Sequence, residues 1–147
     1  MLYTDLTKLA MRIAYDAHHG QTDKCGLPYI FHPFHLAEQF DDETAVCAAL
    51  LHDVVEDTRL TFEDLASLGI TAGVIDALRL LTHDTSLPYM DYVQGIKDSG
   101  NQTAIRVKIE DLKHNSDVSR LGHDSQNETS MIARIKKYNH AIDFLSN

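Results

Sequence analysis

The sequence has 147 residues, 44% of them hydrophobic and 24% charged, which is typical of one globular domain with a sizeable core. Its formal net charge of −9 argues against a nucleic-acid binder, because contacts to phosphates need clustered Lys and Arg. Two cysteines make no disulfide framework, the N-terminus lacks a basic leader segment, and no apolar run approaches transmembrane length. We therefore expect a cytoplasmic protein with no nucleic-acid and no membrane partner.

Helical periodicity dominates the chain. Apolar residues recur at the spacing of one helix face, and Gly, Pro and polar turn residues separate the periodic segments. The predicted helices cover residues 4–18, 33–40, 44–58, 61–69, 71–81, 88–96, 101–115 and 128–145. No strand-like alternation persists beyond a few residues, and no repeat or linker divides the chain. These patterns predict a single all-α domain, a compact helical bundle over residues 1–147.

The predicted helix 44–58 carries the most informative pattern. At about 100° per residue, one sector of roughly 140° on the helical wheel carries four ionisable side chains, those of His52, Asp53, Glu56 and Asp57. The opposite face is apolar, and we expect it to pack against the core. The acids lie at the C-terminal end, where the helix dipole disfavours negative charge, and the segment has no Lys or Arg to pair with them. A bound divalent cation would offset both penalties, so the pattern favours a metal site over a solvated acidic face.

Further metal ligands must come from other segments. His32 precedes a proline at a predicted helix start, and Asp111 lies in the predicted helix 101–115. With His52 and Asp53 they form a mixed set of nitrogen and oxygen ligands, which suits Mn²⁺, Fe²⁺ or Zn²⁺ better than Mg²⁺ or Ca²⁺. Four protein ligands leave coordination positions for water and for a substrate oxygen. The sequence therefore predicts one divalent metal ion.

The residues near these ligands predict hydrolysis of a phosphate compound. Glu56 and Asp57 come soon after His52 and Asp53 and can orient or deprotonate an attacking water. Lys24 and Lys108 could neutralise charge on leaving phosphates. The sequence has no serine, cysteine or aspartyl nucleophile motif, which favours direct attack by water over a covalent intermediate.

Four segments in a fixed order make the joint pattern specific. They read Ala17-His18-His19-Gly20-Gln21, Lys24-Cys25-Gly26-Leu27-Pro28-Tyr29-Ile30-Phe31-His32-Pro33, His52-Asp53-Val54-Val55-Glu56-Asp57-Thr58 and Lys108-Ile109-Glu110-Asp111-Leu112-Lys113-His114-Asn115. This pattern resembles the HD-domain alarmone hydrolases, which are the hydrolase half of the RelA/SpoT enzymes and their single-domain relatives of the Mesh1 type. The resemblance implies a helical HD-type domain that binds Mn²⁺, with Fe²⁺ or Zn²⁺ as alternatives. It also implies removal of pyrophosphate from the 3′ position of guanosine tetra- and pentaphosphate.

The resemblance also implies roles for individual residues. The implied metal ligands are His32, His52, Asp53 and Asp111. The implied catalytic acids are Glu56 and Asp57, and the implied nucleotide contacts are Lys24 and Asn115. The expected partner is thus a small-molecule nucleotide, and a homo-oligomer is compatible with the sequence.

The sequence departs from the family at Asp23, where typical members carry an arginine that packs against the purine. An acid cannot supply that cation–π contact. We therefore expect weak discrimination between guanine and adenine alarmones, and a lower KM for the guanine form in Asp23→Arg. Glu110 and Val118 also replace a small and a hydroxylated residue of the family.

Two alternative functions remain open at this point. Asp23 favours a different HD phosphohydrolase that acts on another nucleotide, such as a nucleoside monophosphate or a phosphorylated dinucleotide. A catalytically silent nucleotide or metal sensor is the second alternative, against which the Glu56-Asp57 pair argues.

The other histidines are expected to be structural or solvent-facing, with His35 on a helix surface or supporting a ligand and His18 as a support for the ligands. Tyr138 is expected to pack in the core. The histidines concerned are His18, His19, His35, His83, His114, His123 and His140.

Overall fold

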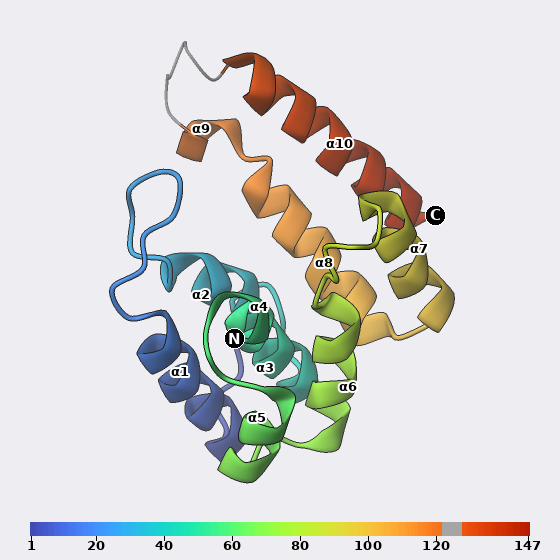
Figure 1. Ribbon diagram of the computed structural model, residues 1–147. Helices are drawn as coiled ribbons and strands as arrows, with labels where there is room; N and C mark the ends of the chain where they lie inside the picture. Colours follow the sequence, from blue (N-terminus) through green and yellow to red (C-terminus); the bar gives the residue numbers. More distant parts are fainter. Residues whose placement is uncertain (122–127) are drawn as a thin grey trace.

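The computed structural model describes residues 1–121 and 128–147, whose regular structure is helical apart from an isolated bridge between Thr22 and Pro28 (Figure 1). The helices are α1 (Asp5–His18), α2 (Phe31–Ala37), α3 (Glu43–Leu51), α4 (Val54–Asp57), α5 (Phe62–Leu68), α6 (Ala72–Leu81), α7 (Tyr89–Ser99), α8 (Gln102–Asn115), α9 (Val118–Leu121) and α10 (Glu128–Ser146). The all-α prediction is confirmed. Two differences stand out, because the predicted helix 44–58 divides in two and α9 had no predicted counterpart.

Helix starts follow side chains that the sequence places before them. Thr4 forms a capping box with the first turn of α1. The side chains of Asp42 and Asn101 accept hydrogen bonds from backbone N–H groups in the first turns of α3 and α8. Gly100 ends α7 at a φ of 67°, which a residue with a side chain adopts at a cost. The caps at Asp42 and Asn101 therefore fix the start of α3, which leads to His52, and the start of α8, which carries Asp111.

Helix α3 is the centre of the hydrophobic core. Every residue from Ala45 to Leu51 is at most 1% exposed, and α3 contacts α1, α2, α6 and α8. A helix in this position is apolar on all sides rather than along one stripe. The predicted division of residues 44–58 into an apolar and an ionisable face is therefore wrong, and the ionisable residues lie beyond the end of α3.

The chain breaks its helix at Asp53. Helix α3 ends at Leu51, Asp53 adopts φ −105° and ψ 0°, and α4 begins at Val54. This conformation lies in the sparsely populated region between the helical and extended ones, so the regular helix stops and restarts there. The break frees the side chains of His52 and Asp53 from the divergence of about 100° that a continuous helix would impose.

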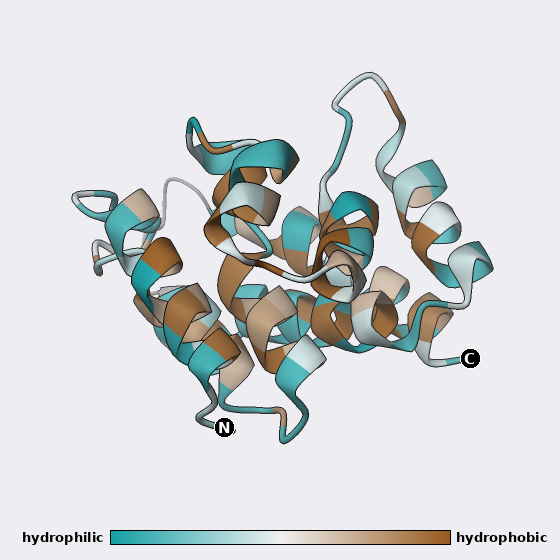
Figure 2. Ribbon diagram, turned by 90° about the horizontal axis from the view of Figure 1, so that it is seen from below, coloured by the Kyte–Doolittle hydropathy of each residue, from teal (hydrophilic) through white to brown (hydrophobic). Residues whose placement is uncertain are grey.

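The remaining helices surround α3 on several sides. Helix α10 runs alongside α8 on one flank of the bundle, and the loop between α1 and α2 projects toward α9 (Figure 1). Hydrophobic residues gather where the helices face one another, whereas hydrophilic residues cover much of the outer side (Figure 2). Among the described residues, no helix combines the length and the apolar character needed to cross a membrane.

Candidate functional site

His52 and Asp53 meet at the break between α3 and α4. Nε2 of His52 lies 2.9 Å from Oδ2 of Asp53. The Nδ1–H group of His52 donates to the carbonyl oxygen of Ala49 at 2.7 Å. This hydrogen bond fixes the imidazole so that Nε2 faces Asp53. The local backbone thus brings together the two adjacent residues that the sequence predicted to share one ion.

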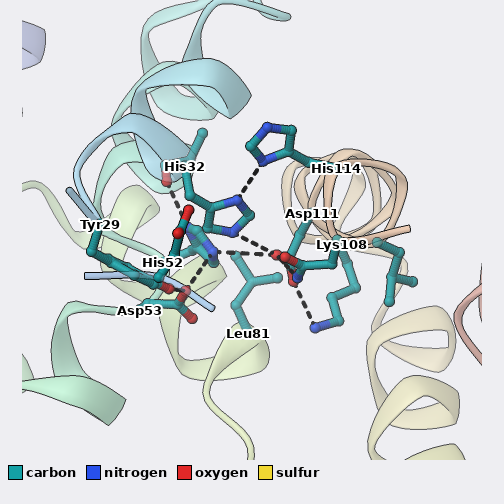
Figure 3. Close-up of polar contacts among 12 residues, drawn as sticks. Tyr29, His32, His52, Asp53, Leu81, Lys108, Asp111 and His114 are labelled. Atoms are coloured by element: carbon teal, nitrogen blue, oxygen red, sulfur yellow. Dashed lines mark hydrogen bonds and ion pairs between the residues drawn. The ribbon is translucent and has the colours of Figure 1, made fainter. Parts of the chain in front are cut away.

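His32 and Asp111 join this pair from α2 and α8 (Figure 3). Oδ1 of Asp111 lies 3.0 Å from Nε2 of His32 and 3.5 Å from Nε2 of His52. Within the described part of the chain, the ligand atoms of His32, His52 and Asp53 all lie within 4.8 Å of one another. Asp111 borders that trio through both imidazoles. Three separate segments therefore converge as the sequence predicted, and the assignment of these residues as ligands stays a prediction.

Asp111 is held on both of its oxygens. Oδ2 accepts a hydrogen bond from Nζ of Lys108 at 2.9 Å, and Oδ1 accepts one from Nδ2 of Asn115 at 2.9 Å. Burial opposes both charges, but Lys108 and His32 hold the pKa of Asp111 well below its usual range, and Asp111 raises the pKa of Lys108 well above its own. Lys108 is thus paired with Asp111, rather than placed as a free cation for leaving phosphates.

The charges of this group fit a divalent cation. Burial disfavours the imidazolium of His52, yet Asp53 and Asp111 raise the pKa of His52 well above its usual value. Its Nε2 is nevertheless buried and lacks a hydrogen-bond partner of good geometry among the described residues. A metal ion would take up that nitrogen and balance the two carboxylates. The donor set of two imidazoles and two carboxylates therefore fits a divalent metal.

Glu56 and Asp57 lie on α4, directly beyond the ligand pair. Burial raises the pKa of both carboxyl groups, and the charge of Asp53 raises each of them further. Oε1 of Glu56 accepts a hydrogen bond from the backbone N–H of His83. Raised pKa values bring these carboxyl groups closer to the range in which they exchange protons near neutral pH. The geometry is compatible with their predicted catalytic role, which stays a prediction.

Tyr29 is a site residue to which the sequence reasoning gave no role. Its hydroxyl donates to Oδ2 of Asp53, and its ring centroid lies 4.7 Å from that of His18. His18 is 1% exposed, and its Nδ1–H donates to Oε1 of Gln21 at 2.9 Å. His18 thus lies behind Tyr29, where it can support Asp53 indirectly. A signal was available, because Tyr29 lies in the same motif segment as His32 and only three residues before it.

A cavity of about 340 Å³ adjoins the metal-ligand group at His32. Its wall combines the loop between α1 and α2, the segment from the end of α8 into α9, and one side of α10. The lining residues are Thr22, Asp23, Lys24, Cys25, Tyr29, His32, Asn115, Arg120, Arg134 and Tyr138. Both predicted nucleotide contacts, Lys24 and Asn115, lie in this wall. Arg120 and Arg134 are additional residues, and Tyr138 borders the cavity as well as the core.

Cations gather at this cavity although the whole chain has a net charge of −9. Burial lowers the pKa of Lys24, and the charges of Arg134 and Lys137 lower it further. A lysine that neighbouring cations affect in this way lies in a region of positive potential, which attracts anions. The cavity is therefore suited to an anionic ligand that also reaches the metal-ligand group.

Asp23 organises the wall of the cavity. Its Oδ1 accepts hydrogen bonds from the backbone N–H groups of Cys25 and Leu27 at 2.8 and 3.0 Å. Its Oδ2 lies 3.3 Å from Nη2 of Arg120, and both side chains are largely buried. Arg120 therefore balances the charge of Asp23, so this acid repels a bound phosphate less than an unpaired acid would. The partner lies 97 residues away in α9, a helix that the sequence pattern did not indicate.

Two further histidines lie at the site. Nδ1 of His114 is 2.7 Å from Nδ1 of His32, and the ring of His35 stacks on His114 with centroids 4.1 Å apart. Burial, the charge of Arg120 and the neighbouring imidazoles lower the pKa of His114 to about 3. His114 was expected to be structural or solvent-facing, and it contacts the candidate ligand His32. His123 lies outside the described residues.

The structure thus combines a helical bundle, a buried His/Asp group and an adjoining cavity that gathers cations. No protein-family model matches the chain. The chain is 36% identical to RSH1, a chloroplastic protein of rice (Oryza sativa subsp. japonica), over 110 residues, which are 71% of this chain and 12% of that protein. It is 49% identical to the bifunctional (p)ppGpp synthase/hydrolase SpoT of Escherichia coli over 63 residues, 40% of this chain and 9% of that protein.

A solved structure shows the same fold. It belongs to a metazoan ortholog of SpoT described as hydrolyzing ppGpp and acting in starvation responses; the TM-score is 0.71 at 23% identity, over 97% of this chain and 94% of that one. These likenesses confirm the resemblance to the HD-domain alarmone hydrolases and their all-α fold. The chain spans only 12% and 9% of the length of the two curated relatives above.

Proposed function

We propose that this chain is a divalent-metal-dependent hydrolase that removes the 3′-pyrophosphate from guanosine 3′,5′-bis(diphosphate), ppGpp, or from related alarmones. The observation that carries the proposal is the convergence of His32, His52, Asp53 and Asp111 at the edge of a cavity that gathers cations. The names of the similar proteins add support, since SpoT of Escherichia coli is a (p)ppGpp synthase/hydrolase and its metazoan ortholog hydrolyzes ppGpp.

The same four residues would hold one metal ion, with Mn²⁺ as our first proposal and Fe²⁺ or Zn²⁺ as alternatives that this donor set also accepts. When bound, the ion supplies Lewis-acid chemistry that polarises a phosphoryl oxygen and activates a water molecule. The protein fixes its donors before the ion arrives: Ala49 orients His52, and Tyr29 holds Asp53.

The acids of α4 would manage the protons of the reaction. Water attacks the phosphorus next to the 3′ oxygen, the bond between that phosphorus and the 3′ oxygen breaks, and the products are GDP and pyrophosphate. Glu56 and Asp57 have raised pKa values, so either carboxylate can accept the proton that the attacking water loses. The proton that the leaving 3′ oxygen needs can return from the same group.

The cavity would hold the rest of the nucleotide. Lys24 and Arg134 can pair with phosphates, because both line the cavity and carry a positive charge. Asn115 joins the two regions, since it lines the cavity and donates to Asp111. The ring of Tyr138 and the guanidinium of Arg120 offer flat surfaces for a base. Asp23 no longer argues for a different nucleotide, because it is paired with Arg120.

The product of the reaction tests the proposal. The Mn²⁺-loaded protein is incubated with ppGpp, with its pentaphosphate form, with the adenine analogue and with GMP, and phosphorus NMR identifies the products after the Mn²⁺ has been removed. We expect pyrophosphate and GDP from ppGpp, and no turnover after EDTA treatment. Release of orthophosphate, or turnover of GMP alone, would assign the site to a different phosphohydrolase. Tight binding of ppGpp without any product would indicate a sensor.

A further inference from the structure

His32 uses both nitrogens of its ring in contacts to α8. Its Nε2 lies 3.0 Å from Oδ1 of Asp111, on the side of the metal-ligand group. Its Nδ1 lies 2.7 Å from Nδ1 of His114, one turn further along α8 (Figure 3). His32 is 3% exposed, so water cannot replace either contact without a rearrangement.

The contact between the two imidazoles has the geometry of a hydrogen bond. The ring planes of His32 and His114 differ by only 7°, with centroids 5.0 Å apart, so the in-plane lone pair of one Nδ1 can face the N–H of the other. Only one of the two nitrogens can carry the shared hydrogen. If His114 carried it, Nδ1 of His32 would be the acceptor, and a neutral His32 would then have its proton on Nε2, where a metal must bind.

The position of the other ring nitrogen of His32 favours the opposite arrangement, in which His32 donates. Nε2 of His32 faces Asp111 and lies among the candidate ligand atoms, so the tautomer that binds a metal carries its proton on Nδ1 and presents it to Nδ1 of His114. Two neighbours hold His114 in place, since Nη1 of Arg120 donates to its carbonyl oxygen at 2.6 Å and the ring of His35 stacks on its ring. With a neutral His114 accepting at Nδ1, the lone pair of His32 Nε2 is directed at the ligand group.

We propose that His114 is a positioning residue for His32: its Nδ1 accepts the Nδ1–H of His32 and so fixes the ring orientation and the tautomer that binds the metal. The proposal rests on the metal centre of the proposed function. It gives α8 two tasks, because this helix supplies Asp111 as a candidate ligand and His114 as the support of a ligand from α2. Such supports are usually carboxylates, carbonyls or waters, and here an imidazole takes their place.

Three variants separate a hydrogen bond from mere packing. His114→Leu removes the acceptor, His114→Asn keeps an acceptor oxygen near the position of Nδ1, and His35→Leu removes the stacked neighbour without touching His32. The affinity for Mn²⁺ is measured by competition with a chelator. We expect roughly 10- to 100-fold weaker binding in His114→Leu, and binding close to wild type in His114→Asn and His35→Leu. Equal affinity in wild type and His114→Leu, or an equal loss in all three variants, would overturn the proposal.

Nitrogen NMR of the wild-type protein provides a readout that needs neither turnover nor a folded Leu variant. We expect a protonated Nδ1 on His32 with a scalar coupling to Nδ1 of His114, and the protein loaded with diamagnetic Zn²⁺ should keep both. A His32 protonated only on Nε2 would overturn the proposal. If the wild type binds no Mn²⁺ at all, the proposed function fails instead; a wild type that binds Mn²⁺ and hydrolyses ppGpp without this coupling refutes the role of His114 alone.

Discussion

The metal-ligand group and the cavity beside it are built in different ways. His32, His52 and Asp111 are 3%, 3% and 6% exposed and are attached to helices of the core. The cavity touches the core helices at His32 and Asn115, but most of its wall comes from a projecting loop, from α9 and from α10, and its cation Lys24 is exposed. Rigid helices thus fix the groups that require precise geometry, whereas loops and outer helices carry the contacts that select a ligand. Substitutions in the two regions should therefore have different kinetic effects.

The largest effect is expected next to the ligand group. Glu56→Gln and Asp57→Asn remove a proton acceptor without removing a proposed ligand, so kcat for ppGpp should fall by roughly 10²-fold or more. Metal content should stay near that of the wild type. If kcat is unchanged and KM rises, these acids contact the substrate instead of handling protons. The expected difference in kinetic effects between the metal-ligand group and the cavity would then not hold for α4.

Cations of the cavity should affect binding instead. Lys24→Met or Arg134→Met removes one proposed phosphate contact, worth about 1 kcal/mol at this exposure, so KM should rise about fivefold while kcat changes little. Lys136→Met is the matched control, because Lys136 is an exposed lysine of the same helix as Arg134 and does not line the cavity. Steady-state kinetics of the three variants would contradict the account if Lys136→Met had the same effect as Arg134→Met.

The structure and the sequence lead to opposite expectations for the KM of Asp23→Arg. Asp23→Asn can keep the oxygen that caps Cys25 and Leu27 but removes the charge opposite Arg120, so KM should rise about threefold. Asp23→Arg places two guanidinium groups together, and it should raise KM further instead of lowering it. The measurement is KM for ppGpp in both variants and in Arg120→Gln. A lower KM in Asp23→Arg would mean that Arg120 does not pair with Asp23 in solution.

The two cysteines allow the cavity and the core to be compared without any substitution. Cys25 lines the cavity, whereas Cys47 lies fully buried in α3, where burial raises the pKa of its thiol to about 12. Iodoacetamide should label Cys25 alone in the native protein, as mass spectrometry of peptides would show. A bound nucleotide should slow that reaction. Labelling of Cys47 at a similar rate would indicate that the core around the ligand group opens readily.

The sequence predicted the ligand group better than the cavity, and the reason is physical. His52 and Asp53 are neighbours in one local pattern, whereas His32 and Asp111 were predicted from the joint order and spacing of the motif segments. The pairing of Asp23 with Arg120 joins residues 97 positions apart, and no local pattern encodes such a contact. The break at Asp53 was also missed, because the helical spacing of apolar residues continues through Val54 and Val55 and does not reveal the change of backbone conformation at Asp53.

Metal content tests the central claim most directly, because it needs no substrate. Elemental analysis is applied to the wild type, to His52→Ala and Asp111→Ala, and to Lys24→Met as a control from the cavity, all purified without chelators. The account predicts about one divalent ion per chain in the wild type and in Lys24→Met, and little metal in the other two variants. Full metal content in both His52→Ala and Asp111→Ala would contradict it.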